Sequence, residues 1–148
     1  MNAARELRRV FDRLEKAYDF SAWHWQPETS QDYVCISAVL VQHTSWSNVE
    51  QALARLEEMG VLSLNAILGM TPARLARLVR PAGTPDTKAQ RLLALARLAA
   101  DHGGLAKLLS QPAAELRERL LATRGIGPET ADAILLYATA RPTLLVDA

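Results

Sequence analysis

Apolar residues recur along much of this chain at the three- and four-residue spacing of a single helix face. The first such stretch covers residues 4–18. Its apolar positions are Leu7, Val10, Phe11, Leu14 and Tyr18. This spacing predicts an amphipathic helix. A second stretch runs from Trp46 to Leu56 and stops at Gly60, a common residue just past a helix end.

Residues 33–42 are almost continuously apolar. Periodicity alone cannot separate a buried strand from a buried helix in such a run. Because the rest of the chain offers few β-branched or aromatic segments to pair with a strand, we expect a buried helix here.

Proline and glycine mark the remaining helices. One helix is predicted to start at Thr71-Pro72 and to stop at 81–83, and the next to be capped by Asp86 or Thr87 and to stop at Gly103-Gly104. Pro112 and Pro128 are predicted to open two further helices, 113–122 and 129–139. The result is about seven or eight short helices joined by tight turns. Leu, Ala and Arg, all good helix formers, dominate the composition. The predicted fold class is all-α, with no convincing domain boundary.

The net charge of +1 and pI of about 8.0 do not by themselves mark a nucleic-acid binder, since such domains usually exceed a pI of about 9. A local basic patch is one alternative, and an ordinary solvated helix face is the other. Charge alone favours the solvated face. The arginines concerned are Arg117, Arg119, Arg124 and Arg141.

Cysteine and histidine usage points away from a metal centre in this chain. The one cysteine, Cys35, lies in the apolar run and suits a small core residue in a reduced, cytoplasmic setting. His24, His43 and His102 do not have metal-ligand spacing. The first residues lack the apolar core of a signal peptide, and the apolar run is far short of a membrane span.

A glycine hairpin near the C-terminal end is the most informative motif. Gly125 and Gly127 bracket Ile126, and Pro128 follows at a position suited to the first residue of a helix. Glycines can take positive φ, and outward-facing amides of such a turn form a phosphate site. Further on, the apolar residues 143–146 lead to a single carboxylate, Asp147.

These residues resemble a known family. Residues 120–132 followed by Val146-Asp147 are similar to the helix-hairpin-helix and catalytic aspartate of the endonuclease III-like (HhH-GPD) superfamily of DNA glycosylases. Residues 37–46 resemble its first barrel helix and Gln-Asn-Thr loop, and residues 80–92 its turn and Lys-Ala-x-x-Leu helix start. The resemblance covers nearly the whole chain and is nearest to the group that includes 3-methyladenine glycosylases.

The resemblance implies two helical lobes with double-stranded DNA in the cleft between them. Residues 1–30 would belong to the second lobe, and residues 31–148 to a six-helix bundle with the hairpin at about 115–139. Because the family continues past the aspartate, we expect a chain truncated after Asp147 with an incomplete second lobe. We expect no cofactor in this chain. An iron–sulfur cluster would be possible only in a missing C-terminal segment. We expect the protein to be a monomer that lies in the cytoplasm and is associated with the nucleoid.

The resemblance also implies a reaction. Asp147 would stabilise an oxocarbenium-like transition state and orient water. Bifunctional family members carry a lysine where this chain has Glu129, and a carboxylate cannot form a Schiff base. We therefore expect a monofunctional glycosylase. Glu129 would either face a cationic base or simply favour the first turn of its helix.

Further residues carry expected roles in base and DNA binding. Trp25 and Trp46 would stack on the extruded base, although packing is the commoner role of large aromatics; Trp23 and His24 are weaker candidates. Gln42 would fill the gap that the base leaves, or be a polar residue at a helix end, and His43 replaces the family's asparagine. The expected backbone-binding residues are Arg124, Gly125, Ile126, Gly127 and Thr130.

The leading functional hypothesis is thus a monofunctional glycosylase for damaged, in particular alkylated, bases in duplex DNA. One alternative is a non-catalytic helix-hairpin-helix DNA-binding module or a truncated inactive fragment. Another is a glycosylase for oxidised or mismatched pyrimidines. A purely structural bundle would leave the hairpin and its spacing to Asp147 unexplained.

Overall fold

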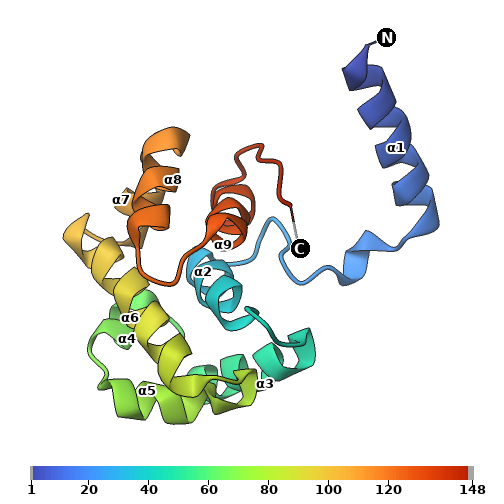
Figure 1. Cartoon of the computed structure of the whole chain (residues 1–148). Helices are drawn as coiled ribbons and strands as arrows, with labels where there is room; N and C mark the ends of the chain where they lie inside the picture. Colours follow the sequence, from blue (N-terminus) through green and yellow to red (C-terminus); the bar gives the residue numbers. More distant parts are fainter. Residues whose placement is uncertain (1, 147–148) are drawn as a thin grey trace.

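The computed structural model describes residues 2–146 of the chain, so that Asp147 lies outside the described residues. These residues form nine α-helices and no strand, which confirms the all-α fold class (Figure 1). The helices are α1 Ala3–Ala17, α2 Gln31–Leu40, α3 Trp46–Glu58, α4 Leu64–Leu68, α5 Pro72–Val79, α6 Pro85–Asp101, α7 Leu105–Leu109, α8 Ala113–Ala122 and α9 Pro128–Ala133.

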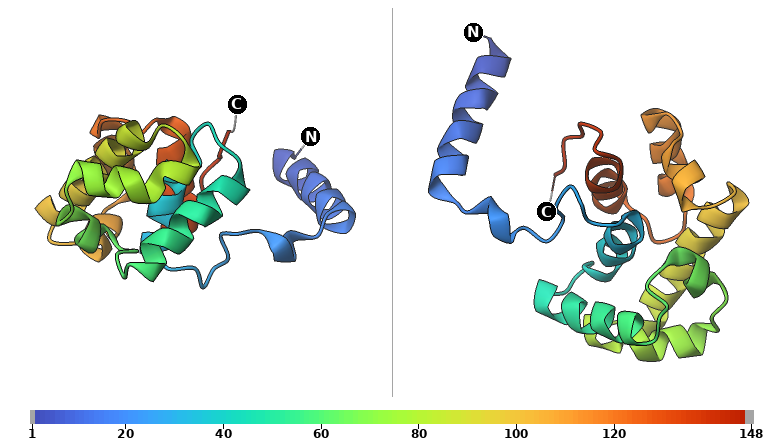
Figure 2. Two further views of the ribbon diagram at one scale, coloured as in Figure 1. Left: turned by 90° about the horizontal axis from the view of Figure 1, so that it is seen from below. Right: turned by 180° about the vertical axis from the view of Figure 1, so that it is seen from behind.

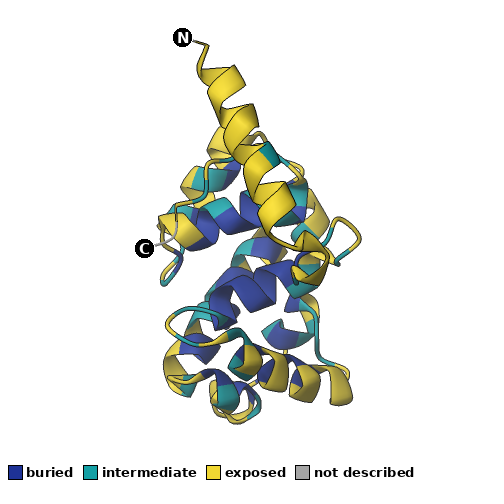
Figure 3. Ribbon diagram, turned by 90° about the vertical axis from the view of Figure 1, so that its right-hand side faces the viewer, coloured by how far each residue is buried: buried dark blue, intermediate teal, exposed yellow. Residues whose placement is uncertain are grey.

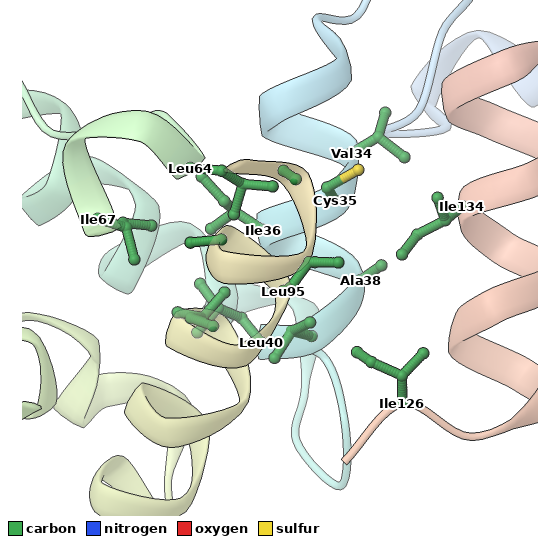
Figure 4. Close-up of a cluster of buried hydrophobic side chains, with 14 of the residues drawn as sticks. Val34, Cys35, Ile36, Ala38, Leu40, Leu64, Ile67, Leu95, Ile126 and Ile134 are labelled. Carbon is green, nitrogen blue, oxygen red and sulfur yellow. The ribbon is translucent and has the colours of Figure 1, made fainter. Parts of the chain in front are cut away.

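Helix α2 passes through the centre of the bundle. Every residue from Val34 to Leu40 is buried, which confirms the buried helix expected from the continuous apolar run. The hydroxyl of Ser30 caps its start by accepting a hydrogen bond from the Tyr33 amide. Around α2, side chains from α4, α6, the hairpin and the segment after α9 form one core (Figure 4). The segment that leads into the candidate site is therefore a helix buried from Val34 to Leu40.

The start of α6 differs from the sequence prediction. The helix begins at Pro85, not after a cap at Asp86 or Thr87, and its N-cap is Thr84 in a left-handed conformation with φ of 40°. Proline at the first helical position needs no amide partner and has the helical φ built in. The preceding turn is closed by the buried side chain of Lys88, whose Nζ donates a hydrogen bond to the carbonyl of Ala82.

Two short helices and one irregular segment were not foreseen. Helices α4 and α7 are five residues each, too short to show a helical repeat. The predicted single helix over 129–139 is also wrong in detail: α9 ends at Ala133 and a π-helical segment, Ile134–Ala138, follows. π-Helical turns are rare and often occur at functional sites.

Helix α1 stands apart from the bundle, joined to it by residues 18–30, in each of the three views (Figures 1 and 2). None of its residues is buried, and its apolar face is open to solvent (Figure 3). The exposed apolar side chains are Leu7, Val10, Phe11, Leu14 and Tyr18. The predicted helix is present, and the assignment of residues 1–30 to a second lobe stays a prediction.

Candidate nucleic-acid interface and base pocket

The hairpin connects α8 to α9 and is anchored in the core by one side chain. Ile126 is only 4% exposed and contacts the cluster around α2 (Figure 4). Gly125 has φ of +84°, a conformation that favours glycine. Gly127 instead has φ of −91° and ψ of −179°, which is extended backbone open to any residue. Only the first glycine therefore uses the conformational freedom expected of both.

The hairpin amides are only partly available to a ligand. The Ile126 amide donates to the Thr123 carbonyl at 3.1 Å, so the expectation of an outward-facing amide does not hold there. Among the residues that the structure describes, the amides of Gly125 and Gly127 have no acceptor. Both amides suit a phosphate oxygen.

Gln42, just past α2, is bonded within the protein at both ends of its carboxamide. Its Nε2 donates to the Gly125 carbonyl at 3.1 Å and to the Thr130 hydroxyl at 2.9 Å. Its Oε1 accepts a hydrogen bond from Nη1 of Arg91, on α6, at 2.5 Å. Gln42 thus ties together α2, α6 and the hairpin, three segments distant in the sequence. Its predicted gap-filling role would require these bonds to open.

An aromatic pocket with a volume of about 510 Å³ lies on one side of Gln42. Trp25, 7% exposed, is held by a hydrogen bond from its Nε1 to the buried Ser37 hydroxyl at 2.8 Å. Leu145, two residues before Asp147, also lines this pocket. The aromatic side chains of the lining are Trp23, His24 and Trp25.

His24 takes the place in the pocket lining that the sequence suggested for Trp46. The two rings are stacked, with centroids 3.5 Å apart and planes 13° from parallel. Trp46 does not line the pocket; its Nε1 donates to Glu50 at 3.1 Å. Burial lowers the pKa of His24, with a smaller opposing effect of the Glu50 charge, so that the neutral imidazole is favoured. The sequence signal for His24 was its position between two tryptophans.

Tyr137 was not singled out in the sequence. It lies in the π-helical segment, and its ring centroid is 4.8 Å from that of Trp25 and 5.9 Å from that of Trp23. Its ring thus packs against the aromatic wall of the pocket, although it is distant from residues 23–25 in the sequence. No periodic pattern could have related position 137 to positions 23–25.

An open groove of about 590 Å³ runs along the hairpin on the other side of Gln42. It is lined by Arg91, Arg124 and the hairpin residues. The groove and the aromatic pocket share four lining residues. These are Gln42, His43, Glu129 and Thr130. A nucleotide could therefore reach both with its phosphate in the groove and its base in the pocket.

His43 and Glu129 lie exposed where the two cavities meet. His43 has φ of 53°, a left-handed conformation that costs a non-glycine residue energy and is common at functional sites. The structure thus brings together eight of the predicted site residues along the groove and its junction with the pocket, and it places Trp25 in the pocket. The eight are Gln42, His43, Arg124, Gly125, Ile126, Gly127, Glu129 and Thr130.

The four arginines near the hairpin do not form one free basic patch. Nε of Arg117 donates to Asp132 at 2.7 Å, which raises the pKa of Arg117. Nη2 of Arg141 donates to the Leu109 carbonyl at 3.1 Å. Arg119 and Arg124 are exposed. Groups of three or more potential metal ligands are absent from residues 2–146.

A model of the HhH-GPD superfamily of base excision DNA repair proteins matches residues 36–148. This chain belongs to that superfamily. Within the described residues, no helix of this superfamily member is both long and apolar enough to cross a membrane.

Two curated relatives of this superfamily member are similar along almost all of the chain. One is a protein of Methanocaldococcus jannaschii named as a DNA repair glycosylase, 35% identical over 150 residues, which cover 99% of this chain and 67% of the relative. The other is the endonuclease III of Thermotoga maritima, 29% identical over 145 residues, covering 97% and 59%. The chain therefore spans only about three fifths to two thirds of their length.

Two solved structures share the fold. The 3-methyladenine DNA glycosylase MagIII of H. pylori, bound to 1,N6-ethenoadenine, superposes with a TM-score of 0.82 at 31% identity, covering 96% of this chain and 67% of its own. A thermostable thymine-DNA glycosylase superposes with a TM-score of 0.71 at 23% identity, covering 99% and 66%.

Proposed function

We propose that this chain is a monofunctional DNA glycosylase of base excision repair that removes damaged, and in particular alkylated, bases. The observation that carries the proposal is the aromatic pocket beside the hairpin groove, with Gln42, His43, Glu129 and Thr130 shared between them. The groove would hold the DNA backbone, and the pocket would receive a base swung out of the helix.

The pocket chemistry suits an electron-poor base. Flat aromatic walls from Trp23, His24 and Trp25 offer stacking surfaces. Because burial lowers the pKa of His24, its neutral ring does not repel a cationic alkylated purine. Glu129, exposed at the junction of the two cavities, adds a negative charge that favours such a cation. An alkylated purine also stacks and bonds to its sugar more weakly, which lowers the cost of extrusion.

Asp147 is our candidate for the catalytic group that lowers the activation barrier for breaking the glycosidic bond. A carboxylate beside C1′ stabilises the positive charge that develops as the glycosidic bond breaks, and it can orient the attacking water. The proposal rests on the family position of Asp147. It is supported by Leu145, two residues earlier, which lines the pocket.

The assignment as monofunctional rests on the chemistry of the pocket lining. Strand cleavage by this family's bifunctional members requires an amine that forms a Schiff base with C1′. Of the described residues that line the pocket, none is a lysine. Lys88, whose pKa burial lowers to about 8, is engaged with the Ala82 carbonyl instead.

Two alternative functions compete with this proposal. A glycosylase for mismatched or oxidised pyrimidines uses the same fold, as the thymine-DNA glycosylase illustrates. A non-catalytic DNA-binding module would use the hairpin alone. The alkylated-base proposal is favoured by the aromatic lining and by the similarity to a 3-methyladenine glycosylase.

The test is base release from DNA by the intact protein. We expect release of 3-methyladenine from alkylated duplex DNA, and a loss on the order of 100-fold for Asp147→Asn. Borohydride should trap no covalent protein–DNA adduct, because no Schiff base forms. Release of pyrimidines alone would favour the first alternative, and salt-dependent DNA binding without release would favour the second. Full activity of Asp147→Asn would contradict the role of Asp147.

A further inference from the structure

We propose that Arg91 is a positioning residue: through the carboxamide of Gln42, it holds the hairpin groove and the aromatic pocket at a fixed separation. The inference rests on the function proposed above and concerns how the same site is held together. None of the motifs that carried the family resemblance assigned Arg91 a role.

Arg91 helps to determine which way the Gln42 amide faces. A guanidinium carries only donors, so the group that it bonds at 2.5 Å must be the amide oxygen. The amide nitrogen is then directed to the Gly125 carbonyl and the Thr130 hydroxyl, at 3.1 and 2.9 Å. A rotated amide would place its oxygen against the Gly125 carbonyl oxygen, where no hydrogen bond can form. Arg91 and the Gly125 carbonyl thus favour the same orientation of the amide, and without Arg91 the amide oxygen loses its donor and the side chain is held from the hairpin side alone.

The hairpin is shaped to let Arg91 reach this amide. A Cβ at Gly125 would overlap the Arg91 side chain, with Cδ and Nε at only 2.6 Å. Glycine at position 125 therefore both leaves room for the Arg91 side chain and allows the positive φ.

This hydrogen-bond set lies between the two cavities. Gln42 and Thr130 line both the groove and the pocket. Under the proposed function, an extruded nucleotide would have its phosphate in the groove and its base in the pocket, with these residues between them. Small errors in such spacing are costly to catalysis, since a misplacement of about 1 Å can reduce a rate about 100-fold.

Arg91 also lines the groove, so a direct phosphate contact is the rival role. The two roles predict different behaviour. A phosphate contact contributes equally to damaged and undamaged DNA and to the salt dependence of binding. A positioning residue matters most where groove and pocket are engaged together, and it acts through Gln42.

The test compares the intact protein with its Arg91→Ala, Gln42→Ala and double variants. Dissociation constants are measured for an undamaged duplex and for a duplex with a tetrahydrofuran abasic-site analogue, across a range of salt concentrations. We expect each single variant to lose about tenfold in affinity for the abasic duplex and less for the undamaged one. The double variant should lose no more than the weaker-binding single variant, because both act on one contact. The salt slope should stay unchanged.

Matched variants guard against simple misfolding. Arg97→Ala removes an exposed arginine from the same helix and should bind like the wild type. Thr130→Val removes one acceptor of Gln42 and should show the same preferential loss on the abasic duplex. Melting temperatures identify any variant that has merely unfolded.

Three outcomes would overturn the inference. Losses that multiply in the double variant would show that Arg91 and Gln42 act independently. An equal loss on both duplexes, with the salt slope reduced by about 0.9, would make Arg91 a phosphate contact. Failure of the wild type to bind either duplex would refute the proposed function along with the inference.

Discussion

The hairpin's two glycines have different physical requirements. Gly125 has positive φ and lies against the Arg91 side chain, whereas Gly127 is extended and a Cβ there would meet no heavy atom within 4 Å. One glycine is therefore required by both conformation and space, and the other by neither.

We expect Gly125→Ala to destabilise the fold by at least about 1–2 kcal/mol, the usual cost of a left-handed conformation for a residue with a Cβ. The displaced Arg91 side chain adds to this cost. Gly127→Ala is the matched control and should change the free energy of unfolding by less than about 0.5 kcal/mol. Denaturant unfolding of both variants measures the difference, and equal effects at the two positions would contradict the structure.

Lys88 is the one charged side chain that is buried among residues 2–146, at 1% exposure. Burial, with a smaller contribution from the charge of Arg91, lowers its pKa from the ordinary 10.5 to about 8. Below pH 8 the lysine is protonated in both states and the penalty of burying the charge is present in full. Between pH 8 and 10.5 the unfolded chain binds more protons than the folded one, so stability rises with pH.

We therefore expect the wild type to gain on the order of 1–3 kcal/mol relative to Lys88→Met as the pH rises through this window. The comparison uses denaturant unfolding of both proteins at matched pH values. Using the difference between the two proteins removes the contributions of tyrosines that titrate in the same range. A difference that stays flat with pH would mean that the folded lysine keeps its ordinary pKa.

At the scale of elements, the aromatic segment 23–25 is attached to α2 through a short chain of hydrogen bonds. Nε1 of Trp25 donates to the Ser37 hydroxyl, which in turn donates to the Tyr33 carbonyl at 2.6 Å. Ser37 is fully buried, and it is the polar residue within the apolar stretch of α2. Its position explains why a serine interrupts this core helix.

We expect Ser37→Ala to cost about 1–3 kcal/mol, because it leaves the buried indole N–H without an acceptor. The free energy of unfolding and the tryptophan emission measure the effect. In a Trp25→Phe background, which has no indole donor, the same substitution should be close to neutral. An equally large cost in that background would show that Ser37 stabilises α2 and not the aromatic segment.

How far the sequence predicts an element depends on its length and on where its partners lie. Helix α2 could be predicted because its apolar run had to be buried and the rest of the chain offers few segments for a strand to pair with. Helix α5 could be predicted because Thr71 and Pro72 form a local start signal. The one-turn helices α4 and α7 are set by tertiary packing, which leaves no periodic trace. The contact between Arg91 and Gln42 joins positions 49 residues apart, and nothing in either local sequence indicates it.

At the scale of the whole molecule, the candidate site belongs to the bundle and to the segment that precedes it. The hairpin motif and its spacing predicted the groove, since both derive from adjacent residues. The pocket was predicted only in part, because its wall combines residues 23–25 with residues 38–44 and 129–133. Stacking of His24 on Trp46 depends on how that segment folds back, which composition does not encode.

The stability of helix α1 bears on how the molecule is divided into lobes. A helix of 15 residues with no buried side chain has little tertiary stabilisation, and helices of this length are marginal in water on their own. In the 148-residue chain we expect the amides of α1 to exchange with solvent deuterium far faster than those of α2, whose residues from Val34 to Leu40 are all buried.

Phe11→Ser should leave the melting temperature of this chain unchanged, with Leu40→Ser as the destabilising control. If residues 1–30 belong to a second lobe, α1 should become protected in a longer protein that supplies further helices, and there Phe11→Ser should destabilise. Protection of α1 equal to that of α2 in the 148-residue chain would instead place this helix within the bundle.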